Sequence, residues 1–354
     1  MKMPSCSDYM LSIDTPQLIK AKTLSGGHVV KVNNNIVRYV GGFCVVFPFQ
    51  TIGKKHAVRC WFVNVCDAKT RTKLIAEELR RISLPYFVGF EYVDEGIMTD
   101  SGIQPIVLMD WIEAKPLKVY LEEHLGDTTS ILRLAENFKQ MVHDLHQHNL
   151  AHGDLQHGNI MVKDDGSIVL VDYDSMYVPA LQGYKDDIKG LEGYQHESRW
   201  SNEYMTPKAD YFSELIIYTS LKALARFPSL WNDLEMEDTD TMLFTAEDLA
   251  SKGSSPVFTV LESDSELKHL SHAIKQALHQ RNLNDLLPLE EAIVSPQDRI
   301  VEDVTSQWGD NGYVKPVVDY EALVGSVKDS WGDNGYVEEK YNTQKDIEDT
   351  IKKW

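Results

Sequence analysis

The stretch AHGDLQHGNIMVKDDGSIVLVDYDS, residues 151–175, constrains the fold most, because it sets two His, one Asn and five Asp among apolar runs. Two of these runs, with Asp165-Gly166 between them, predict a β-hairpin with a tight turn. A hairpin brings its two ends together, so Asn159 before it and Asp172 after it are expected to lie close to Asp154. The fold must therefore bury two short strands and gather three polar side chains at their ends.

These three residue types suit phosphoryl transfer from a nucleotide. Mg²⁺ is a hard cation that takes oxygen ligands, and it uses few protein carboxylates because it keeps waters and phosphate oxygens. An attacking hydroxyl needs a nearby carboxylate that orients it and accepts its proton. The pattern therefore predicts Asp154, Asn159 and Asp172 as catalytic residues. Asp154 would serve the hydroxyl, and Asn159 and Asp172 would bind the metal ion, Mg²⁺ or Mn²⁺.

The hydrophobic pattern divides the chain into a strand-rich first part and a helix-rich second part. Before about residue 116, one amphipathic stretch predicts a helix at 67–83. Runs rich in Val, Phe and Ile predict strands at 28–33, 36–49, 54–65, 86–97 and 103–114. Later in the chain, apolar residues at helical spacing predict helices at 131–149, 209–227 and 266–280.

Charge and cysteine content exclude several classes of protein. The 354 residues carry a net charge of −19, and such a field disfavours binding to nucleic acid or to an anionic membrane surface. No segment approaches the roughly 20 apolar residues of a membrane span. The cysteines, Cys6, Cys44, Cys60 and Cys66, form no CxxC pair, so free thiols in a reducing compartment are expected. We therefore expect a cytoplasmic protein with no nucleic-acid or membrane partner.

Three motifs of the second part resemble the protein-kinase superfamily. HGDLQHGN at 152–159 is similar to the catalytic loop HRDLxxxN, and DYD at 172–174 is similar to DFG, at the family's spacing. ADYFSELIIYTSLKAL, from Ala209, resembles the D-x-W-S start of the buried long helix. GGFCVVF, AVRCW and VDYDSMYVPAL also resemble a group of bacterial Ser/Thr-kinase-like proteins. The resemblance covers about residues 25–295 and implies a bilobal kinase-like fold of the α+β class that binds ATP.

The resemblance implies a nucleotide site in the strand-rich lobe. YVGGFCVVF aligns with the loop that covers the nucleotide, and HAVRCW aligns with the strand whose Lys binds phosphates, so that Arg59 stands in the Lys position. Glu77 or Glu78 on the following helix is its expected partner. VLMDWIEA resembles the hinge that offers backbone groups to adenine. The cofactor-binding residues implied are Gly41, Gly42, Val46, Ala57, Arg59, Glu78, Met109, Asp110 and Ile112.

The large lobe departs from the family pattern beside the catalytic Asp. Gly153 replaces the Arg of HRD, so phosphorylation of the activation segment is not expected to act through that position. The resemblance implies that Asp210 caps its helix and holds the catalytic-loop backbone. It also implies an activation segment over 172–197, with Glu197 paired to Arg281.

The predicted domains are an N-terminal extension at 1–24, a kinase-like N-lobe at 25–113, a kinase-like C-lobe at 114–298 and an acidic tail at 299–354. The tail contains the heptamer WGDNGYV twice. Trp and Tyr in a polar tail favour a recruitment motif for a partner protein, with two copies raising avidity. The alternatives are a duplicated linker without a partner and a segment that inhibits the kinase cleft.

The predicted function is that of an ATP-dependent Ser/Thr protein kinase that transfers the γ-phosphoryl group to a protein substrate. One alternative is a pseudokinase, a nucleotide-binding or scaffold module with little turnover. Tyr39 and Cys44 at glycine positions favour it, and so does Arg59. The other alternative is a small-molecule kinase of the aminoglycoside or choline kinase type. The HGD form favours it, together with Asp174, the acidic residue in place of the Gly of DFG.

Overall fold

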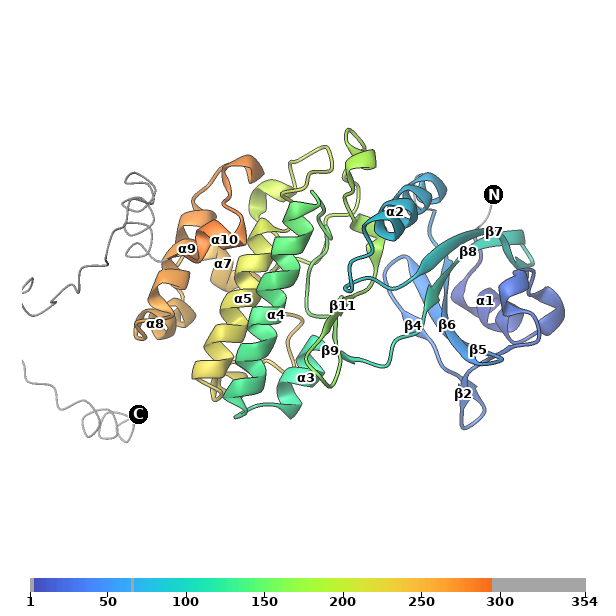
Figure 1. The fold of residues 1–354 in the computed structure, drawn as a ribbon, viewed down its shortest axis with the longest axis horizontal. Coiled ribbons are helices and arrows are strands. Elements are labelled where there is room, and N and C mark those ends of the chain that lie inside the picture. The colour runs from blue at the N-terminus through green and yellow to red at the C-terminus, as the bar shows by residue number, and fades with distance from the viewer. Residues whose placement is uncertain (1–2, 65–66, 295–354) are drawn as a thin grey trace, which may run out of the picture. The chain divides into compact units, whose positions relative to one another are not determined.

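The computed structural model describes residues 3–64 and 67–294, which lie within one compact unit, Met1–Ser295. The predicted tail at 299–354, with both copies of WGDNGYV, lies outside the described residues, and so does Cys66. The other three cysteines are free thiols. A strand-rich lobe (blue in Figure 1) is followed along the chain by a helical lobe (green to orange).

The N-lobe is built on an antiparallel sheet in the order β1, β5, β6, β8, β7, and β4 also pairs with β5. These strands are β1 (His28–Val29), β4 (Tyr39–Val40), β5 (Cys44–Thr51), β6 (Lys54–Trp61), β7 (Phe90–Thr99) and β8 (Gly102–Asp110). A separate hairpin joins β2 (Lys31–Val32) to β3 (Asn35–Ile36). One helix, α2 (Ala68–Ile82), interrupts the strands and packs against β7.

Alternation along the strands gives this sheet two different faces. On β5, Cys44 and Val46 contribute to the core shared with the C-lobe, whereas Val45 and Phe47 belong to a second core inside the N-lobe. On β8, Met109 belongs to the shared core. The face that carries Cys44, Val46 and Met109 is therefore placed to form one wall of a site between the lobes.

The residues before position 25 pack onto the N-lobe. α1 (Cys6–Ile13) begins with a capping box made by Ser5 and Asp8. The hydroxyl of Tyr9 donates to the carbonyl of Trp61 at 2.8 Å, and Ile13 is 2% exposed. The sequence pattern did not predict this helix, which covers the second core of the sheet.

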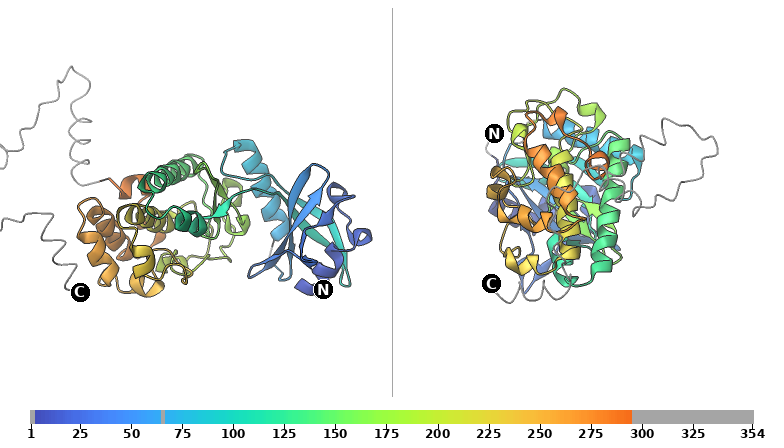
Figure 2. Two further views of the ribbon diagram at one scale, coloured as in Figure 1. Left: turned by 90° about the horizontal axis from the view of Figure 1, so that it is seen from below. Right: turned by 90° about the vertical axis from the view of Figure 1, so that its left-hand side faces the viewer.

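The C-lobe is mainly helical, with a small sheet of β9 (Lys115–Pro116), β10 (Ile160–Val162) and β11 (Ile168–Leu170), in which β10 is central. Its helices are α3 (Leu117–Glu123), α4 (Thr128–Gln147), α5 (Tyr211–Arg226), α6 (Leu230–Asp233), α7 (Ala246–Ala250), α8 (Pro256–Glu262), α9 (Lys268–Leu278) and α10 (Leu289–Ala292). The two longest, α4 and α5, pack side by side (Figures 1 and 2).

The predicted fold class, α+β with a sheet-rich N-lobe and a mainly helical C-lobe, is confirmed. The predicted hairpin pairs Ile160 with Leu170 and turns at Gly166, whose φ is +82°. The stretches predicted as strands at 28–33 and 36–49 divide into shorter strands. Positive φ angles at Asn33 and Asn34 turn the chain between the two stretches, so that β2 pairs with β3. No helix within the described residues is long and apolar enough to cross a membrane.

Replacing Ile13 by Ala is expected to lower the free energy of unfolding by about 2–5 kcal/mol, because it leaves a cavity under α1. Leu11→Ala on the same helix is the matched control. Leu11 is 72% exposed, so its truncation should change the free energy by less than about 0.5 kcal/mol. Urea denaturation measures both variants, and equal effects would contradict the packing of α1 on the sheet.

Candidate active site

A buried aspartate fixes the backbone of the predicted catalytic loop. Asp210, which precedes α5, accepts hydrogen bonds from the backbone N–H groups of His152 and Gly153, and the bond from Gly153 to Oδ1 is 2.9 Å long. The side chain of Asp210 makes no capping bond to α5. The resemblance implied that Asp210 both caps α5 and holds the catalytic-loop backbone. Its carboxylate does only the latter, because both of its oxygens accept hydrogen bonds from the loop.

Gly153 is a glycine because no side chain fits there. Its φ is +79°, and a Cβ would lie 2.1 Å from the carbonyl oxygen of Ser175. The catalytic loop and the turn after β11 therefore touch through their backbones. This close approach leaves no room for the Arg that the kinase family has at this position.

The carboxylate of Asp154 is held on both oxygens. Asn159 donates through Nδ2 to Oδ2 at 3.0 Å and to the backbone carbonyl of Asp154 at 2.8 Å. The N–H of Leu191 donates to Oδ1 at 2.9 Å. Burial raises the pKa of Asp154 above its ordinary value, and the charge of Asp172 adds to this rise. Asp154 is thus oriented and has an increased proton affinity.

Asp172 follows β11 and leads into the 3₁₀ turn Tyr173–Ser175. Its φ of +65° is unusual for a residue with a side chain, and such backbone strain is concentrated at functional sites. A 3.0 Å bond from the N–H of Val171 to the carbonyl of Asn159 ties the ends of the hairpin together. Since Asp172 also acts on the pKa of Asp154, the structure brings all three predicted catalytic residues together.

The oxygen donors of this site fit a nucleotide-bound Mg²⁺. Asn159 uses its amide nitrogen on Asp154, so its amide oxygen can face a cation beside Asp172, whose side chain is 44% exposed. Among residues 3–64 and 67–294, no group of three or more His, Cys, Asp or Glu could hold a metal ion. Mg²⁺ takes one or two protein oxygens and completes its shell with phosphates and water.

The predicted adenine-binding side chains share the sheet face that belongs to the inter-lobe core. Val46 and Ala57 are partly buried against this core, and Met109 is 8% exposed. The strand register sets Met109 beside Ala57 and Arg59 beside Val46. The structure therefore places three apolar side chains and one cation on a single wall.

Two of the three predicted hinge residues have backbone N–H groups engaged elsewhere. The N–H of Asp110 donates to the carbonyl of Gly89 at 2.8 Å, and that of Trp111 donates to the backbone carbonyl of Lys55 at 3.3 Å. Ile112 lies beyond the end of β8 and packs against the core shared by the two lobes. Among these N–H groups, that of Ile112 is the remaining candidate for a base contact.

Trp111 lies within the predicted hinge, but the sequence patterns assigned no role to its side chain. Its ring lies 6.1 Å from that of Tyr39 on the covering hairpin, and Nζ of Lys55 lies 4.0 Å from the ring centre. Its indole N–H is buried without a hydrogen-bond partner in the described part of the chain. An acceptor on a bound ligand would satisfy this N–H.

The covering loop is a tight turn between β4 and β5. The N–H of Gly41 donates to the carbonyl of Cys44 at 2.9 Å and is therefore engaged within the turn. A Cβ on Gly42 would meet no atom within 4 Å, so the packing of the protein does not require a glycine there. The open space at Gly42 lets a phosphate approach the backbone closely.

Arg59 pairs with carboxylates of the C-lobe. Its Nη2 lies 2.9 Å from Oδ1 of Asp172 and 2.6 Å from Oδ2 of Asp174, and its Nε donates to Sγ of Cys44. Burial lowers the pKa of Arg59, but the two carboxylates outweigh burial and raise it, so the guanidinium stays charged. The sequence signal for the pair of Arg59 with Asp174 was the acidic residue that Asp174 provides in place of the Gly of DFG.

The predicted partner of Arg59 on α2 was wrong. Glu77 is exposed, and Glu78 pairs with Arg81 on the same helix at 2.6 Å. The buried side of α2 instead presents Arg71, which is 5% exposed and donates to a backbone carbonyl of the DYD turn at 3.0 Å. Both glutamates lie off this buried face, so α2 offers the site a cation where a carboxylate was expected.

The predicted pair of Glu197 with Arg281 was also wrong. Glu197 lies 3.3 Å from Nζ of Lys252, and both side chains are exposed. The buried arginine of this region is Arg199, whose partner is Asp186 at 2.6 Å. An exposed glutamate gains little from a salt bridge, whereas a buried arginine requires one.

The two lobes, the loop with Asp154 and Asn159, and the turn with Asp172 define a protein-kinase-like domain. Residues 96–181 match the family model described as the ABC1 atypical kinase-like domain. This span contains the hinge, the catalytic loop and the DYD turn. No curated protein matches the chain. The fold and this match together support a kinase-like ATP-binding module.

A double-mutant cycle is expected to separate the observed partner of Arg59 from the predicted one. Arg59→Gln with Asp174→Asn should show a coupling energy of about 1–3 kcal/mol, because the two groups are in buried contact. Arg59→Gln with Glu78→Gln should be additive within about 0.5 kcal/mol. Chemical denaturation of the single and double variants gives both values. Equal coupling for Glu78 and Asp174 would contradict the pairing.

Proposed function

We propose that this protein is an ATP-dependent Ser/Thr protein kinase, which transfers the γ-phosphoryl group of ATP to a hydroxyl of a protein substrate. The observation that carries the proposal is the meeting of Asp154, Asn159 and Asp172 at one end of the β10–β11 hairpin. They supply a carboxylate for the hydroxyl and oxygen ligands for a nucleotide-bound cation. The family match spans all three residues and supports the kinase-like part of the proposal.

Each residue of the site has a task in this proposal. Asp154 orients the substrate hydroxyl and accepts its proton, which its raised pKa favours. Asn159 and Asp172 hold Mg²⁺ or Mn²⁺, which when bound neutralises phosphate charge. Arg59, beside Asp172, contacts the α- and β-phosphates. Adenine lies against Val46, Ala57 and Met109.

A protein substrate is favoured by the chain segment that lies over Asp154. The N–H of Leu191 donates to Oδ1 of Asp154, so the activation segment contacts the proposed base and is near enough to contact a polypeptide substrate there. Gly153, which favoured a small-molecule kinase, has a local explanation in its contact with Ser175. The HGD form is therefore also compatible with a protein substrate.

An ATP-binding module with little turnover is the second candidate. Arg59 is already shared by Asp172 and Asp174, and the N–H of Gly41 is engaged in its own turn. Both observations reduce the positive charge and the donors that face a triphosphate. This candidate predicts nucleotide binding without transfer.

Transfer from γ-labelled ATP with Mg²⁺ or Mn²⁺, to the protein itself and to a generic basic protein, tests the proposal. Label is expected with the unaltered protein. Asp154→Asn and Asp172→Ala should lower the rate by roughly 10²–10⁴-fold, because they remove the base and a metal ligand. Asp233→Asn, at an exposed carboxylate on α6, is the control and should keep the full rate.

The outcomes of this experiment separate the candidates. Label that persists in Asp154→Asn would contradict the role of Asp154. Absence of label together with thermal stabilisation by ATP would favour the second candidate or a small-molecule substrate. Absence of both label and stabilisation would overturn the nucleotide hypothesis.

We further propose that the duplicated WGDNGYV motif recruits a partner protein. Each copy contains a Trp, Trp308 or Trp331, within an acidic polar sequence. Trp308→Ala and Trp331→Ala should each weaken capture of the partner, and the double variant should abolish it, because two linked sites raise avidity by about 10²–10⁴-fold. Cross-linking and mass spectrometry in cell extract measure the effect. An unchanged partner set in the double variant would contradict recruitment.

A further inference from the structure

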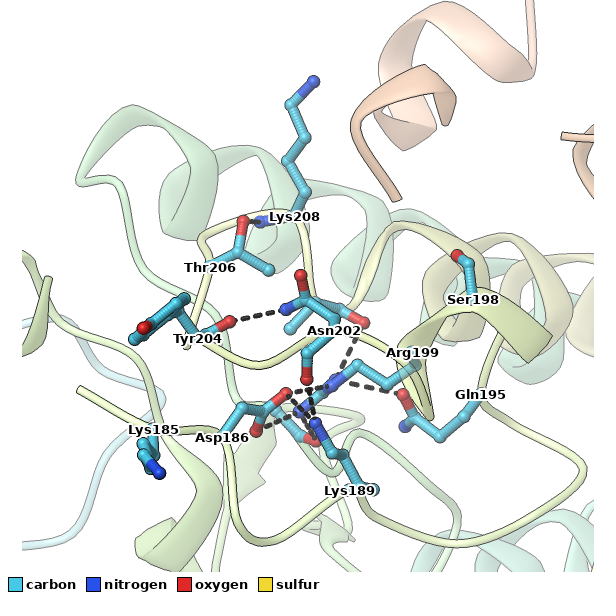
Figure 3. Close-up of polar contacts among 12 residues, drawn as sticks. Lys185, Asp186, Lys189, Gln195, Ser198, Arg199, Asn202, Tyr204, Thr206 and Lys208 are labelled. Atoms are coloured by element: carbon cyan, nitrogen blue, oxygen red, sulfur yellow. Dashed lines mark hydrogen bonds and ion pairs between the residues drawn. The ribbon is translucent and has the colours of Figure 1, made fainter. Parts of the chain in front are cut away.

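The activation segment is closed into a loop by a buried ion pair. Arg199 and Asp186 are 1% and 3% exposed, and Nε and Nη2 of Arg199 lie 2.6 Å and 3.1 Å from the two carboxylate oxygens. Figure 3 shows Arg199 and Lys189 directed at this carboxylate. Nζ of Lys189 lies 3.4 Å from Oδ2. Two cations therefore compensate the buried charge of Asp186.

Every N–H of the Arg199 guanidinium has an acceptor. Besides the two bonds to Asp186, Nη1 donates to Oε1 of Gln195 at 3.1 Å and to the carbonyl of Ala209 at 3.2 Å. The second N–H of Nη2 donates to the carbonyl of Gly153 at 3.1 Å. A rigid fork of five donors matches these acceptors, whereas the three donors of a Lys do not. Arg199 thus joins the activation segment to the catalytic loop.

The ion pair acts on Asp154 from two directions. Gly153, directly before Asp154, has its N–H on Asp210 and its carbonyl on Arg199. Within the loop that Arg199 closes, the N–H of Leu191 donates to Oδ1 of Asp154. Opening the ion pair would remove one of the two backbone anchors of Gly153, its carbonyl bond to Arg199, and would free the segment that bonds the carboxylate of Asp154.

Phosphorylation is a common way to order a kinase activation segment, through new pairs between phosphate and arginine. In this chain the position of the HRD arginine is Gly153, where the backbone leaves no room for a side chain. Arg199, just after the end of the activation segment at 172–197, supplies a guanidinium to the same loop, and Asp186 within the segment supplies the carboxylate that pairs with it.

We propose that Arg199 and Asp186 are positioning residues for Asp154 and that they order the activation segment without phosphorylation. The inference rests on the proposed function, because it treats Asp154 as the base of the transfer reaction. Its structural part concerns the segment 186–199 alone and is measured independently of activity.

Hydrogen exchange on the full-length, unphosphorylated protein tests the structural part. Arg199→Lys and Asp186→Asn are expected to speed exchange of the amides in 186–199, including that of Leu191, by about tenfold or more. Arg226→Lys is the matched control, because Arg226 lies at the C-terminal end of α5, away from the catalytic loop, and its side chain is 63% exposed in its pair with Asp264. Slow exchange that neither variant changes would overturn the proposal, as would fast exchange in the unaltered protein.

Steady-state kinetics of the same proteins test the effect on Asp154. Both variants should lower kcat by about tenfold or more and leave KM for ATP within about twofold, because the nucleotide wall of the N-lobe is untouched. Phosphatase treatment, verified by mass spectrometry, should leave kcat of the unaltered protein unchanged. A fall in kcat after phosphatase treatment would overturn the proposal, and so would a rise in KM for ATP with kcat preserved.

Failure of the proposed function has a different signature. An unaltered protein with neither phosphoryl transfer nor stabilisation by ATP would refute the kinase, whereas the exchange data would still decide whether the ion pair orders the segment. Asp186→Asn keeps the shape of the side chain and serves if Arg199→Lys proves poorly folded. Circular dichroism and the unfolding midpoint identify such a loss of fold.

Discussion

The candidate active site depends on the buried carboxylate of Asp210, which holds two consecutive backbone N–H groups of the loop that leads to Asp154. Hydrogen bonds to an ionised acceptor are stronger than neutral ones, and a buried carboxylate has no water to replace them. Because Asp210 directly precedes α5, the position of Asp154 is coupled to the packing of the central helices of the C-lobe.

Charges join the two lobes with one consistent polarity. Arg59 from β6 pairs with the carboxylates of Asp172 and Asp174 in the DYD turn. Arg71 from α2 donates to a backbone carbonyl of the same turn. The N-lobe thus supplies the cations and the C-lobe the anions. In the proposed kinase, the phosphates of ATP compete with Asp174 for Arg59, so nucleotide affinity reflects the strength of that pair.

The sequence patterns predicted the elements that neighbouring residues decide and missed those that depend on distant contacts. The hairpin around Asp165-Gly166 and the long helices α4 and α5 follow from turn chemistry and apolar periodicity. α1 was not predicted because a helix of eight residues is stabilised mainly by packing against the sheet, which is distant in the sequence. Glu78 was assigned to the site by alignment, but a small rotation around a helix axis decides which residue faces inward.

The sequence by itself determined the class of the fold and the identity of the catalytic candidates, because Asp154, Asn159 and Asp172 flank a hairpin whose pattern is local. Only the tertiary structure decided which charges pair. Arg59 and Asp174 are 115 positions apart, and their contact exists because the two lobes pack together. No local pattern encodes such a contact, since its energy depends on burial and distance, which the completed fold creates.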